Sequence, residues 1–471
     1  MIITPVGAIL LLSIGGIFLY KKNIFANLFM LCLITEVFVR MGYVAAIGNT
    51  TITYEGVVQY ILIAYCLLNL PRWSKAIRKW WVLLAVSYII PMVLLILFPS
   101  NALVSTFDVT WDEILFEGAS LVYPTVTGFV VKNSLKFIAY SFVIIYIYQK
   151  WKLSDYQQMM AKFLDISKVF LCLGYVEFVA KNMFGLNETW GNLLILLFGE
   201  KESTAYEGRL RGNTFELNLF TQEASHYAYV LMFVALLSLA YNVFINKERK
   251  IGGIVIGSLL LMVLTTSFSS VYLSVTFIIY YLLYRWYILK PKSEKIEKIV
   301  LGSIICLGSV SITAILSIYS DGFVVGRLLN LIDNFEDFFT VNVTYGSQYG
   351  DGSSQVRLIS MIQTIMVFFQ RPIFGYSLYS IYAHSPTAMY LAGVGVFGML
   401  CWIKFFFYVS PLYKQFSLVK KPYALAIALL LFMNLLGGDR HTFSGVMLAM
   451  NGVAYIFLYA DKKLLNENSP C

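Results

Sequence analysis

The chain has 471 residues, of which 59% are hydrophobic and only 13% are charged. Soluble domains are about a quarter charged, so this composition excludes an ordinary water-soluble protein and requires lipid as the solvent for much of the chain. The net charge of +9 raises nucleic acid as a partner, but the distribution of the basic residues favours a membrane explanation and no nucleic acid.

Apolar runs of helical length predict an all-α fold, a polytopic transmembrane bundle forming one domain over residues 1–471. A helix needs about 20 residues to cross a hydrocarbon core of roughly 30 Å, so the shorter runs are expected to tilt. The first run has no basic leader and precedes Lys21 and Lys22, which predicts an uncleaved span. About thirteen spans are predicted, at residues 2–20, 24–47, 53–70, 80–98, 134–148, 163–184, 226–245, 251–266, 270–289, 299–319, 385–408, 423–437 and 442–459.

Every second connection between these spans is basic. Lys and Arg are enriched in cytoplasmic loops, so these connections are predicted to be cytoplasmic, with the N-terminus outside and the C-terminus inside. The basic groups are Lys21/Lys22, Arg72/Lys75/Arg78/Lys79, Lys150/Lys152/Lys162, Lys247/Arg249/Lys250, Arg285 to Lys298, Lys414/Lys420/Lys421 and Lys462/Lys463.

Three long connections, at residues 99–133, 185–225 and 320–384, are expected to be extracytoplasmic loops. Loops of this length are usually functional or disordered. The third is rich in Phe and Tyr, which predicts that it folds. The six cysteines show neither metal-ligand spacing nor a loop-based disulfide framework.

Residues 251–284 contain no charged residue, and their centre is polar from Thr265 to Ser270. Two helices and a turn hardly fit in this length, so the turn is expected at or below the outer membrane surface. Irregular backbone there must be buried in protein or face a watery cavity. A tight helical hairpin and a cavity-lining turn both remain open.

Two pairs of opposite charges lie within predicted spans, Glu36 with Arg40 and Glu177 with Lys181. The four-residue spacing favours ion pairs within one helix, because an intramembrane charge needs a partner. In the alternative interpretation Arg40, Lys136 and Lys181 contact an anionic lipid headgroup near the outer leaflet.

The second outer loop ends in a cluster of residues able to carry chemistry. Arg209 and Arg211 alternate, so they share a face if the chain is extended. Glu223 and His226 follow at the mouth of the next span. The structural alternative is that Ser225 or Thr221 caps that helix and Glu223 favours its dipole.

The third outer loop contains a predicted amphipathic helix within residues 353–372, where Ser353 or Ser354 can cap the start and Pro372 limits continuation. Arg357, Ser360 and Thr364 line its polar side. A surface helix is the simpler interpretation. In the alternative, Arg357 faces a cavity and grips a phosphate with its planar fork.

Several motifs are absent from the sequence. It has no Asp-x-Asp pair for a metal-bound nucleotide sugar, no phosphate-binding Gly-rich loop with Lys, no Gly-x-Ser-x-Gly and no His-Glu-x-x-His. This argues against a nucleotide-driven transporter, a nucleotide-sugar transferase and an embedded metalloprotease.

A series of short motifs lies in order over about residues 205–400. They are Arg211-Gly212 with Phe215, Glu223-Ala-Ser-His-Tyr-Ala228, Leu264-Thr-Thr-Ser-Phe-Ser269, Arg357-Leu358, Pro372-x-x-Gly375, His384, Ala392-Gly-Val-Gly395 and Gly398. Taken together, these motifs resemble the O-antigen polymerase and O-antigen ligase superfamily of bacterial envelope glycosyltransferases. Four residues depart from the family pattern, namely Ala224 for Pro, Phe268 for Arg, Ser377 for Gly, and Ser385 for the Asn that follows the histidine.

The resemblance implies a GT-C-like enzyme at the outer face of the bacterial cytoplasmic membrane. It would transfer a glycan from polyprenyl diphosphate to a second lipid-linked repeat unit, without metal or cofactor. Its partners would be the lipid-linked donor and acceptor, the bilayer and a chain-length regulator. The expected cations for the diphosphate are Arg211, Arg357, Arg209, Arg440 and Arg40.

His384 is the first choice for the catalytic base, since only His has an unperturbed pKa near neutrality and its position matches the family's histidine. Glu223 is the second choice. The structural alternative is that His384 packs at a helix start. All three histidines, His226, His384 and His441, fall at the outer ends of predicted spans.

Two other functions remain open. A ligase of the same superfamily would transfer a finished glycan to another acceptor. A lipid-linked oligosaccharide flippase, or another secondary transporter, also carries charges at mid-depth, but such proteins often show internal repeats that this sequence lacks.

The predicted topology can be tested with single cysteines and a membrane-impermeant label. Residues 108–117 and 340–355 are expected to react from outside, and residues 247–250 and 290–298 only from inside. Labelling of 340–355 from the cytoplasm would reverse the alternation of loops and contradict the whole arrangement.

Overall fold

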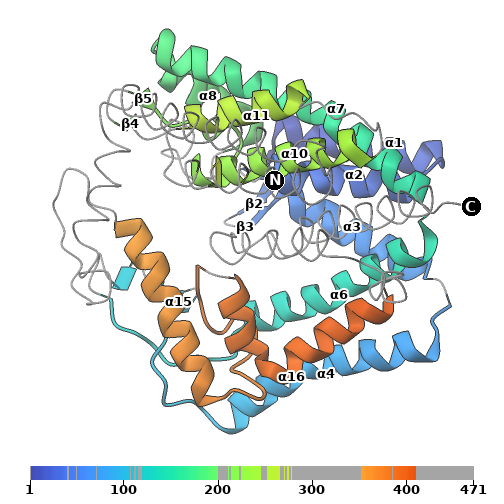
Figure 1. Cartoon of the computed structure of the whole chain (residues 1–471), viewed down its shortest axis with the longest axis vertical. Coiled ribbons are helices and arrows are strands. Elements are labelled where there is room, and N and C mark those ends of the chain that lie inside the picture. The colour runs from blue at the N-terminus through green and yellow to red at the C-terminus, as the bar shows by residue number, and fades with distance from the viewer. Residues whose placement is uncertain are drawn as a thin grey trace, which may run out of the picture.

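The structure is a computed structural model of the chain and shows a mostly helical protein (Figure 1). It describes residues 2–39, 42–48, 50–70, 72–106, 108–110, 113–114, 119–151, 153–199, 210–211, 214–221, 224–244, 252–265, 270, 273–274, 277, 352–384 and 386–409.

The described helices are α1 Pro5–Tyr20, α2 Ile24–Val37, α3 Tyr54–Leu68, α4 Lys75–Leu97, α6 Gly128–Lys150, α7 Leu153–Phe178, α8 Asn187–Phe198, α10 Ala224–Phe244, α11 Gly253–Leu264, α15 Gly352–Gln370 and α16 Pro386–Val409, with a π-helix η1 at Val179–Met183 directly after α7. Short antiparallel strands accompany them: β1 Ile2–Ile3, β2 Ala45–Ile47 and β3 Thr50–Ile52 in one sheet, and β4 Leu210–Arg211 with β5 Thr214–Phe215 in another.

Local sequence sets several helix starts. A Ser or Thr precedes each of four helices, and its hydroxyl oxygen accepts a hydrogen bond from a free backbone N–H of the first turn, as an N-cap does. The four caps are Thr4 to Gly7 (3.0 Å), Thr53 to Gly56 (3.2 Å), Ser74 to Ile77 (3.2 Å) and Thr127 to Val130 (3.4 Å).

Most predicted helices are present where the structure describes the chain. The amphipathic helix expected within residues 353–372 is confirmed as α15. The 185–225 connection contains α8 and the β4–β5 hairpin, which the sequence did not predict. The spans at 299–319, 423–437 and 442–459, and most of 270–289, lie outside the described residues.

The prediction of one span over 24–47 is wrong, because α2 ends at Val37 and the chain continues into β2. Gly42 has a left-handed φ of 78°, and a Cβ there would lie 2.2 Å from the carbonyl oxygen of Phe198 in α8. The backbone at Gly42 therefore packs closely against α8, a helix distant in sequence, between the end of α2 and the start of β2. Glu36, predicted near mid-depth, is the penultimate residue of α2.

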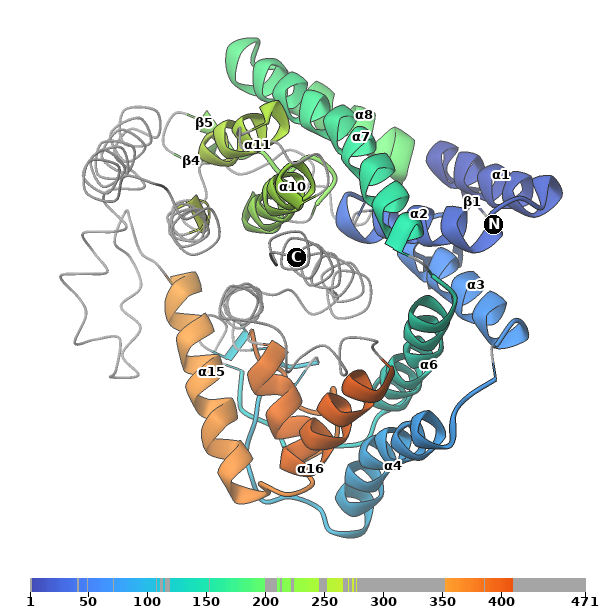
Figure 2. The same cartoon turned by 45° about the vertical axis from the view of Figure 1, so that its right-hand side comes forward.

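The described helices follow one another round an open curve, most directly visible in Figure 2. Packing joins α11 to α7, α7 to α2, α2 to α3, α3 to α6, α6 to α4, α4 to α16 and α16 to α15. Helices far apart in sequence, such as α4 and α16, therefore lie side by side (Figures 1 and 2).

Two described helices are long and apolar enough to cross a membrane, Lys75–Leu97 and Gly128–Ile147. Large apolar side chains also point outward, among them Leu12, Leu19 and Leu68, which are 76%, 84% and 86% exposed. Exposed apolar surface on this scale is costly in water and is typical of contact with lipid or another protein. These features associate the protein with a membrane.

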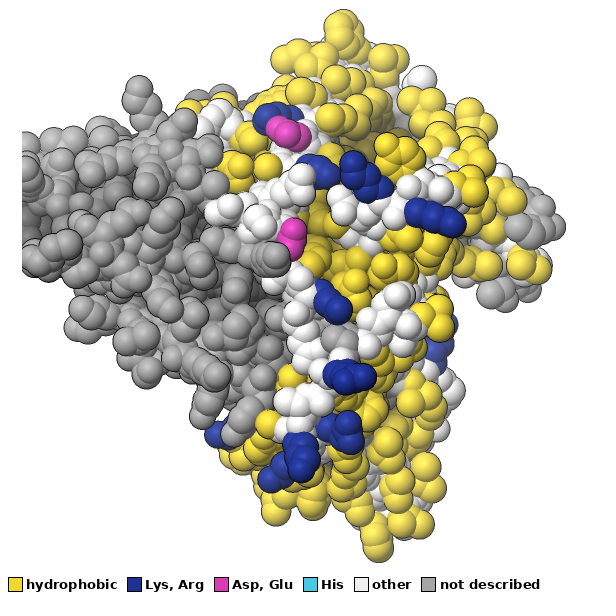
Figure 3. Space-filling view, turned by 90° about the vertical axis from the view of Figure 1, so that its right-hand side faces the viewer, with side chains coloured by type: hydrophobic (Ala, Val, Ile, Leu, Met, Phe, Trp, Pro, Cys, Tyr) yellow, Lys and Arg dark blue, Asp and Glu magenta, His cyan; other side chains and the backbone are white. Residues whose placement is uncertain are grey.

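Basic residues gather at one end of the helices. Lys21 follows α1, Lys75 begins α4 and Lys150 ends α6, and these helix ends lie on the right in Figure 1. Figure 3 views that end, where dark blue Lys and Arg side chains cross the surface between yellow apolar areas. The side of the membrane on which this end lies stays a prediction of the positive-inside rule.

Helix α16 is interrupted at Gly395, whose φ of 64° and ψ of −174° are not helical. In a continuous helix the N–H of Val396 would donate to Ala392, and the N–H of Phe397 to Gly393. These two N–H groups and two carbonyls instead bond to another segment of the chain.

The segment 372–377, which precedes α16, supplies those partners. Its carbonyls accept hydrogen bonds from the two N–H groups of α16, and its own N–H groups donate to the two carbonyls. The four bonds are Val396 to Pro372 (2.9 Å), Phe397 to Ile373 (3.0 Å), Tyr376 to Ala392 (2.9 Å) and Ser377 to Gly393 (2.8 Å).

Three glycines allow this close approach of backbone to backbone. A Cβ on Gly375 would lie 2.4 Å from the carbonyl oxygen of Ala392, and one on Gly395 would lie 2.3 Å from that of Ile373. Gly393 is also crowded, with a backbone Cα 2.9 Å from where its Cβ would be. The glycines that stand in separate sequence motifs therefore meet at one contact.

Replacing these glycines is expected to destabilise the protein. Gly375→Ala and Gly395→Ala would add a methyl group against backbone and force a side chain into a strained φ, at a cost on the order of 1–3 kcal/mol or more. The measurement is the midpoint of thermal unfolding in detergent, which is expected to fall.

Gly15→Ala is the matched control, because Gly15 lies within α1 and nothing lies within 4 Å of its Cβ position. Alanine is the better helix former, so this variant is expected to keep or raise the midpoint. A wild-type midpoint for Gly395→Ala would show that the interruption of α16 does not need glycine.

Candidate functional site

His384 lies in the short connection between α15 and α16 and is half-buried. Its backbone N–H donates to the hydroxyl oxygen of Ser360 on α15 at 2.8 Å. The hydroxyl of Tyr382 lies 3.0 Å from its Nδ1 and 3.3 Å from its Nε2, and the tautomer decides which group donates. The imidazole is thus oriented by a neighbouring hydroxyl, as catalytic bases are.

Tyr382 is itself held by the first outer loop. Its N–H donates to the carbonyl of Ser105 at 2.8 Å, and the Ser105 hydroxyl donates back to the carbonyl of Tyr382 at 2.8 Å. A small separate core lies around this connection, formed by Leu95, Ala102, Val104, Val367, Phe368, Tyr376, Ile381 and Ala392. Segments from four parts of the chain therefore converge on the histidine.

The polar side of α15 faces the protein interior. Ser360 and Thr364 are 0% and 2% exposed, whereas Ile362 and Phe369 are 37% and 70% exposed. A helix lying in water would show the opposite pattern, so the apolar side suits lipid and the polar side suits an interior site. Position 357 lies three residues before Ser360 in α15.

Two residues of the connection have left-handed backbone without being glycine, Ser377 at φ 90° and Tyr379 at φ 68°. Such conformations cost about 1–3 kcal/mol and persist where the surroundings impose them. Ser377 is one of the four departures from the pattern that the motifs resemble. Burial raises the pKa of the Tyr379 hydroxyl.

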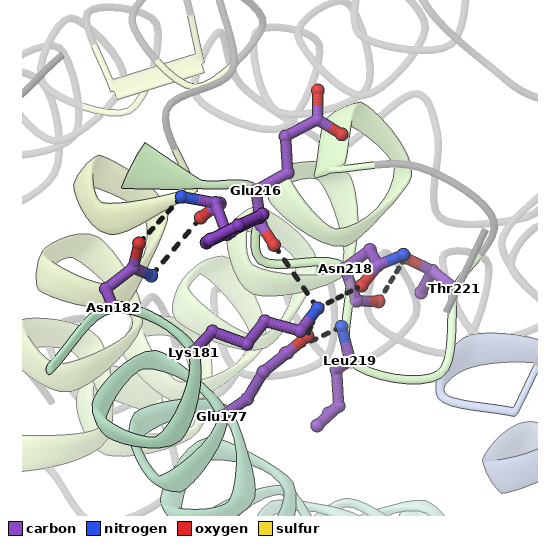
Figure 4. Close-up of polar contacts among 8 residues, drawn as sticks. Glu177, Lys181, Asn182, Glu216, Asn218, Leu219 and Thr221 are labelled. Carbon is purple, nitrogen blue, oxygen red and sulfur yellow. Dashed lines mark hydrogen bonds and ion pairs between the residues drawn. The ribbon is translucent and has the colours of Figure 1, made fainter. Parts of the chain in front are cut away.

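The predicted ion pair between Glu177 and Lys181 is confirmed, with 2.7 Å between Nζ and Oε1 and both side chains fully buried (Figure 4). Lys181 Nζ also donates to the Glu216 carbonyl (3.4 Å) and to Asn218 Oδ1 (3.3 Å). Its partners are protein groups, so Lys181 does not reach outward to a lipid headgroup.

Glu36 lies in a second buried polar group between α2, α3 and α6. Its Oε1 accepts hydrogen bonds from Gln59, from Tyr140 (3.3 Å) and from Cys32 (3.5 Å). Arg40 lies outside the described residues, so the Glu36–Arg40 pair stays a prediction.

The structure describes some of the predicted site residues and leaves others outside the described ranges. His384 and His226 each lie within a few residues of a helix start, as expected. The structure describes the backbones of Arg211, in β4, and Arg357, in α15. That Arg211 and Arg357 lie within reach of one cavity stays a prediction. Arg40, Arg209, Glu223, Arg440 and His441 lie outside the described residues.

Within the described part of the chain, no group of three His, Cys, Asp or Glu side chains is arranged to hold a metal ion. The four described cysteines, Cys32, Cys66, Cys172 and Cys401, are free thiols. Chemistry without a metal remains an expectation from the sequence.

Sequence reasoning missed Tyr382 and Ser105. Tyr382 had a local signal, since it stands two residues before His384 and alternate residues of an extended segment share a face. Ser105 had none, because it is 277 positions from its hydrogen-bond partner. Ser360 was assigned to the polar side of α15, but its contact with His384 was not foreseen.

The chain was compared with family models, with curated proteins and with solved structures, and none of them matches it. Its function is therefore argued from its own residues and from the resemblance of its motifs.

Proposed function

We propose that the protein is a polysaccharide repeat-unit polymerase of the cytoplasmic membrane of a bacterium. It would transfer a glycan from polyprenyl diphosphate to a second lipid-linked repeat unit at the outer face. The observation that carries the proposal is the setting of His384. It is oriented by Tyr382 and lies against the inward polar side of α15 in a membrane-associated helical protein.

The reaction assigns a role to each group. The acceptor hydroxyl oxygen attacks the anomeric carbon of the donor sugar, and the bond from that carbon to the diphosphate oxygen breaks. The hydroxyl proton passes to the imidazole of His384, with Glu223 as the second choice of base. The diphosphate leaves with the bonding electrons, and Arg211 and Arg357 offset its charge.

The topology belongs to the same proposal. About thirteen spans would place the N-terminus outside and the C-terminus in the cytoplasm. The face in Figure 3 would then be cytoplasmic, and the loops that hold His384 would lie at the other end of the helices. Arg209, Arg440 and Arg40 would add to the cationic field of that outer end.

One assay separates this function from its alternatives. Purified protein is reconstituted with a lipid-linked repeat unit from its own cell envelope. Longer lipid-linked chains indicate a polymerase. Transfer only to a different acceptor indicates a ligase, and movement across the bilayer without bond formation indicates a flippase.

His384→Ala is expected to abolish chain growth in that assay, because no base would take the acceptor proton. Tyr382→Phe keeps the ring but loses the hydroxyl that orients the imidazole, so it is expected to slow growth on the order of 10²-fold or less. Rates are measured across pH, with donor binding and expression as controls. Normal growth by His384→Ala would transfer the role of base to Glu223.

Arg357→Lys and Arg211→Lys are each expected to reduce chain growth at least about tenfold. A lysine keeps the positive charge but cannot form the bidentate contacts that a guanidinium makes with phosphate oxygens. The rate with saturating donor is compared with that of Arg72→Lys, a control at the basic end of the molecule. Full activity of Arg357→Lys would favour the surface-helix interpretation.

A further inference from the structure

We propose that Glu177, Lys181 and Asn182 are positioning residues that set the place of Arg211 and Glu223 in the site. The inference rests on the proposed function and extends it. None of the three residues is assigned contact with the substrate. They act on the segment 214–221, which links the β4–β5 hairpin to the start of α10.

The ion pair holds the later part of that segment. The ammonium of Lys181 forms an ion pair with Glu177 Oε1 and donates hydrogen bonds to the Glu216 carbonyl and to Asn218 Oδ1 (Figure 4). The other carboxylate oxygen of Glu177 accepts the N–H of Leu219 at 2.8 Å. The Glu177 carboxylate and the Lys181 ammonium therefore each contact the other charged group and also the segment 214–221.

Asn182 holds the earlier part. Its side-chain oxygen accepts the N–H of Phe215 at 2.7 Å, and its side-chain nitrogen donates to the carbonyl of Phe215 at 3.3 Å. The amide thus bonds β5 as a neighbouring strand would. On its other side β5 pairs with β4, where Arg211 stands opposite Thr214.

The segment also ends in a local turn. Both the N–H and the hydroxyl of Thr221 donate to the carbonyl of Asn218, at 2.8 and 2.6 Å. Glu223 follows Thr221 by two positions and directly precedes α10. Arg211 and Glu223, twelve positions apart in sequence, thus flank one anchored segment.

The three anchoring residues stand where α7 changes into the π-helix η1. Single π-helical turns are uncommon and are frequent at functional sites. A buried ion pair is also weak evidence for stability, since desolvation offsets much of its attraction, and a specific placement is its better-attested use. Both facts favour positioning over simple reinforcement of the bundle.

Helix α7 offers a matched control. Asp165 and Lys168 form an ion pair of similar length, 2.6 Å, but their side chains are 68% and 57% exposed. Exposed pairs contribute little. Removing this pair changes the charges of the same helix without touching the segment 214–221.

The test compares Asn182→Ala and the double variant Glu177→Gln/Lys181→Met with Asp165→Asn/Lys168→Met. Asn182→Ala leaves no buried charge unpaired, so it answers the question even if the double variant fails to fold. A spin label on Leu210→Cys, a position that is 61% exposed, reports the mobility of the hairpin. The native cysteines are replaced beforehand, and the kcat and KM of chain growth are measured for each variant.

In the two anchor variants the spin label is expected to become more mobile and kcat to fall on the order of tenfold to 10²-fold, because small displacements of catalytic groups have effects of that size. KM for the donor is expected to change less, and the control variant is expected to match wild type in every measurement. This combination supports the proposal.

Two results would overturn it: a label that stays as immobile as in wild type, or a more mobile label with unchanged kcat. A wild-type protein that extends no lipid-linked glycan would instead remove the proposed function, and the positioning role with it. The two failures are distinguishable, because in the first case the wild type is active.

Discussion

Backbone groups in a membrane need partners within the protein, and the interruption of α16 shows how far this requirement shapes the molecule. The backbone is not helical at Gly395, and four hydrogen bonds join the residues around it to the segment 372–377. These bonds fix the connection that carries Tyr382 and His384. The proposed base is therefore positioned by backbone bonding as well as by its own side-chain contacts.

The other part of the proposed site is held by a different interaction with the same purpose. Around Lys181 a buried charge pair, not a helix interruption, supplies the bonds for irregular backbone. In both places a segment outside the helices is bonded to a helix, to the following helix α16 in one case and to the end of α7 and η1 in the other. Loops anchored in this way can hold charged groups in one fixed geometry. Stabilisation of a transition state requires groups that are positioned in advance.

The orientation of α15 shows which side of this helix suits lipid and which side suits the protein interior. Its buried Ser360 and Thr364, with Ile362 and Phe369 exposed, reverse the arrangement of a helix in water. Helical spacing predicted which residues share a side, but spacing is the same whichever side faces inward. The contact between Ser360 and His384 decided the direction.

The sequence by itself determined the helical class, the association with a membrane, the positions of most described helices and the Glu177–Lys181 pair. All of these depend on composition or on contacts within about one helical turn. Only the tertiary structure decided that α2 ends at Val37, that three motif glycines meet, and that Ser105 supports Tyr382. Those features arise from backbone groups far apart in sequence, whose partners no local pattern specifies.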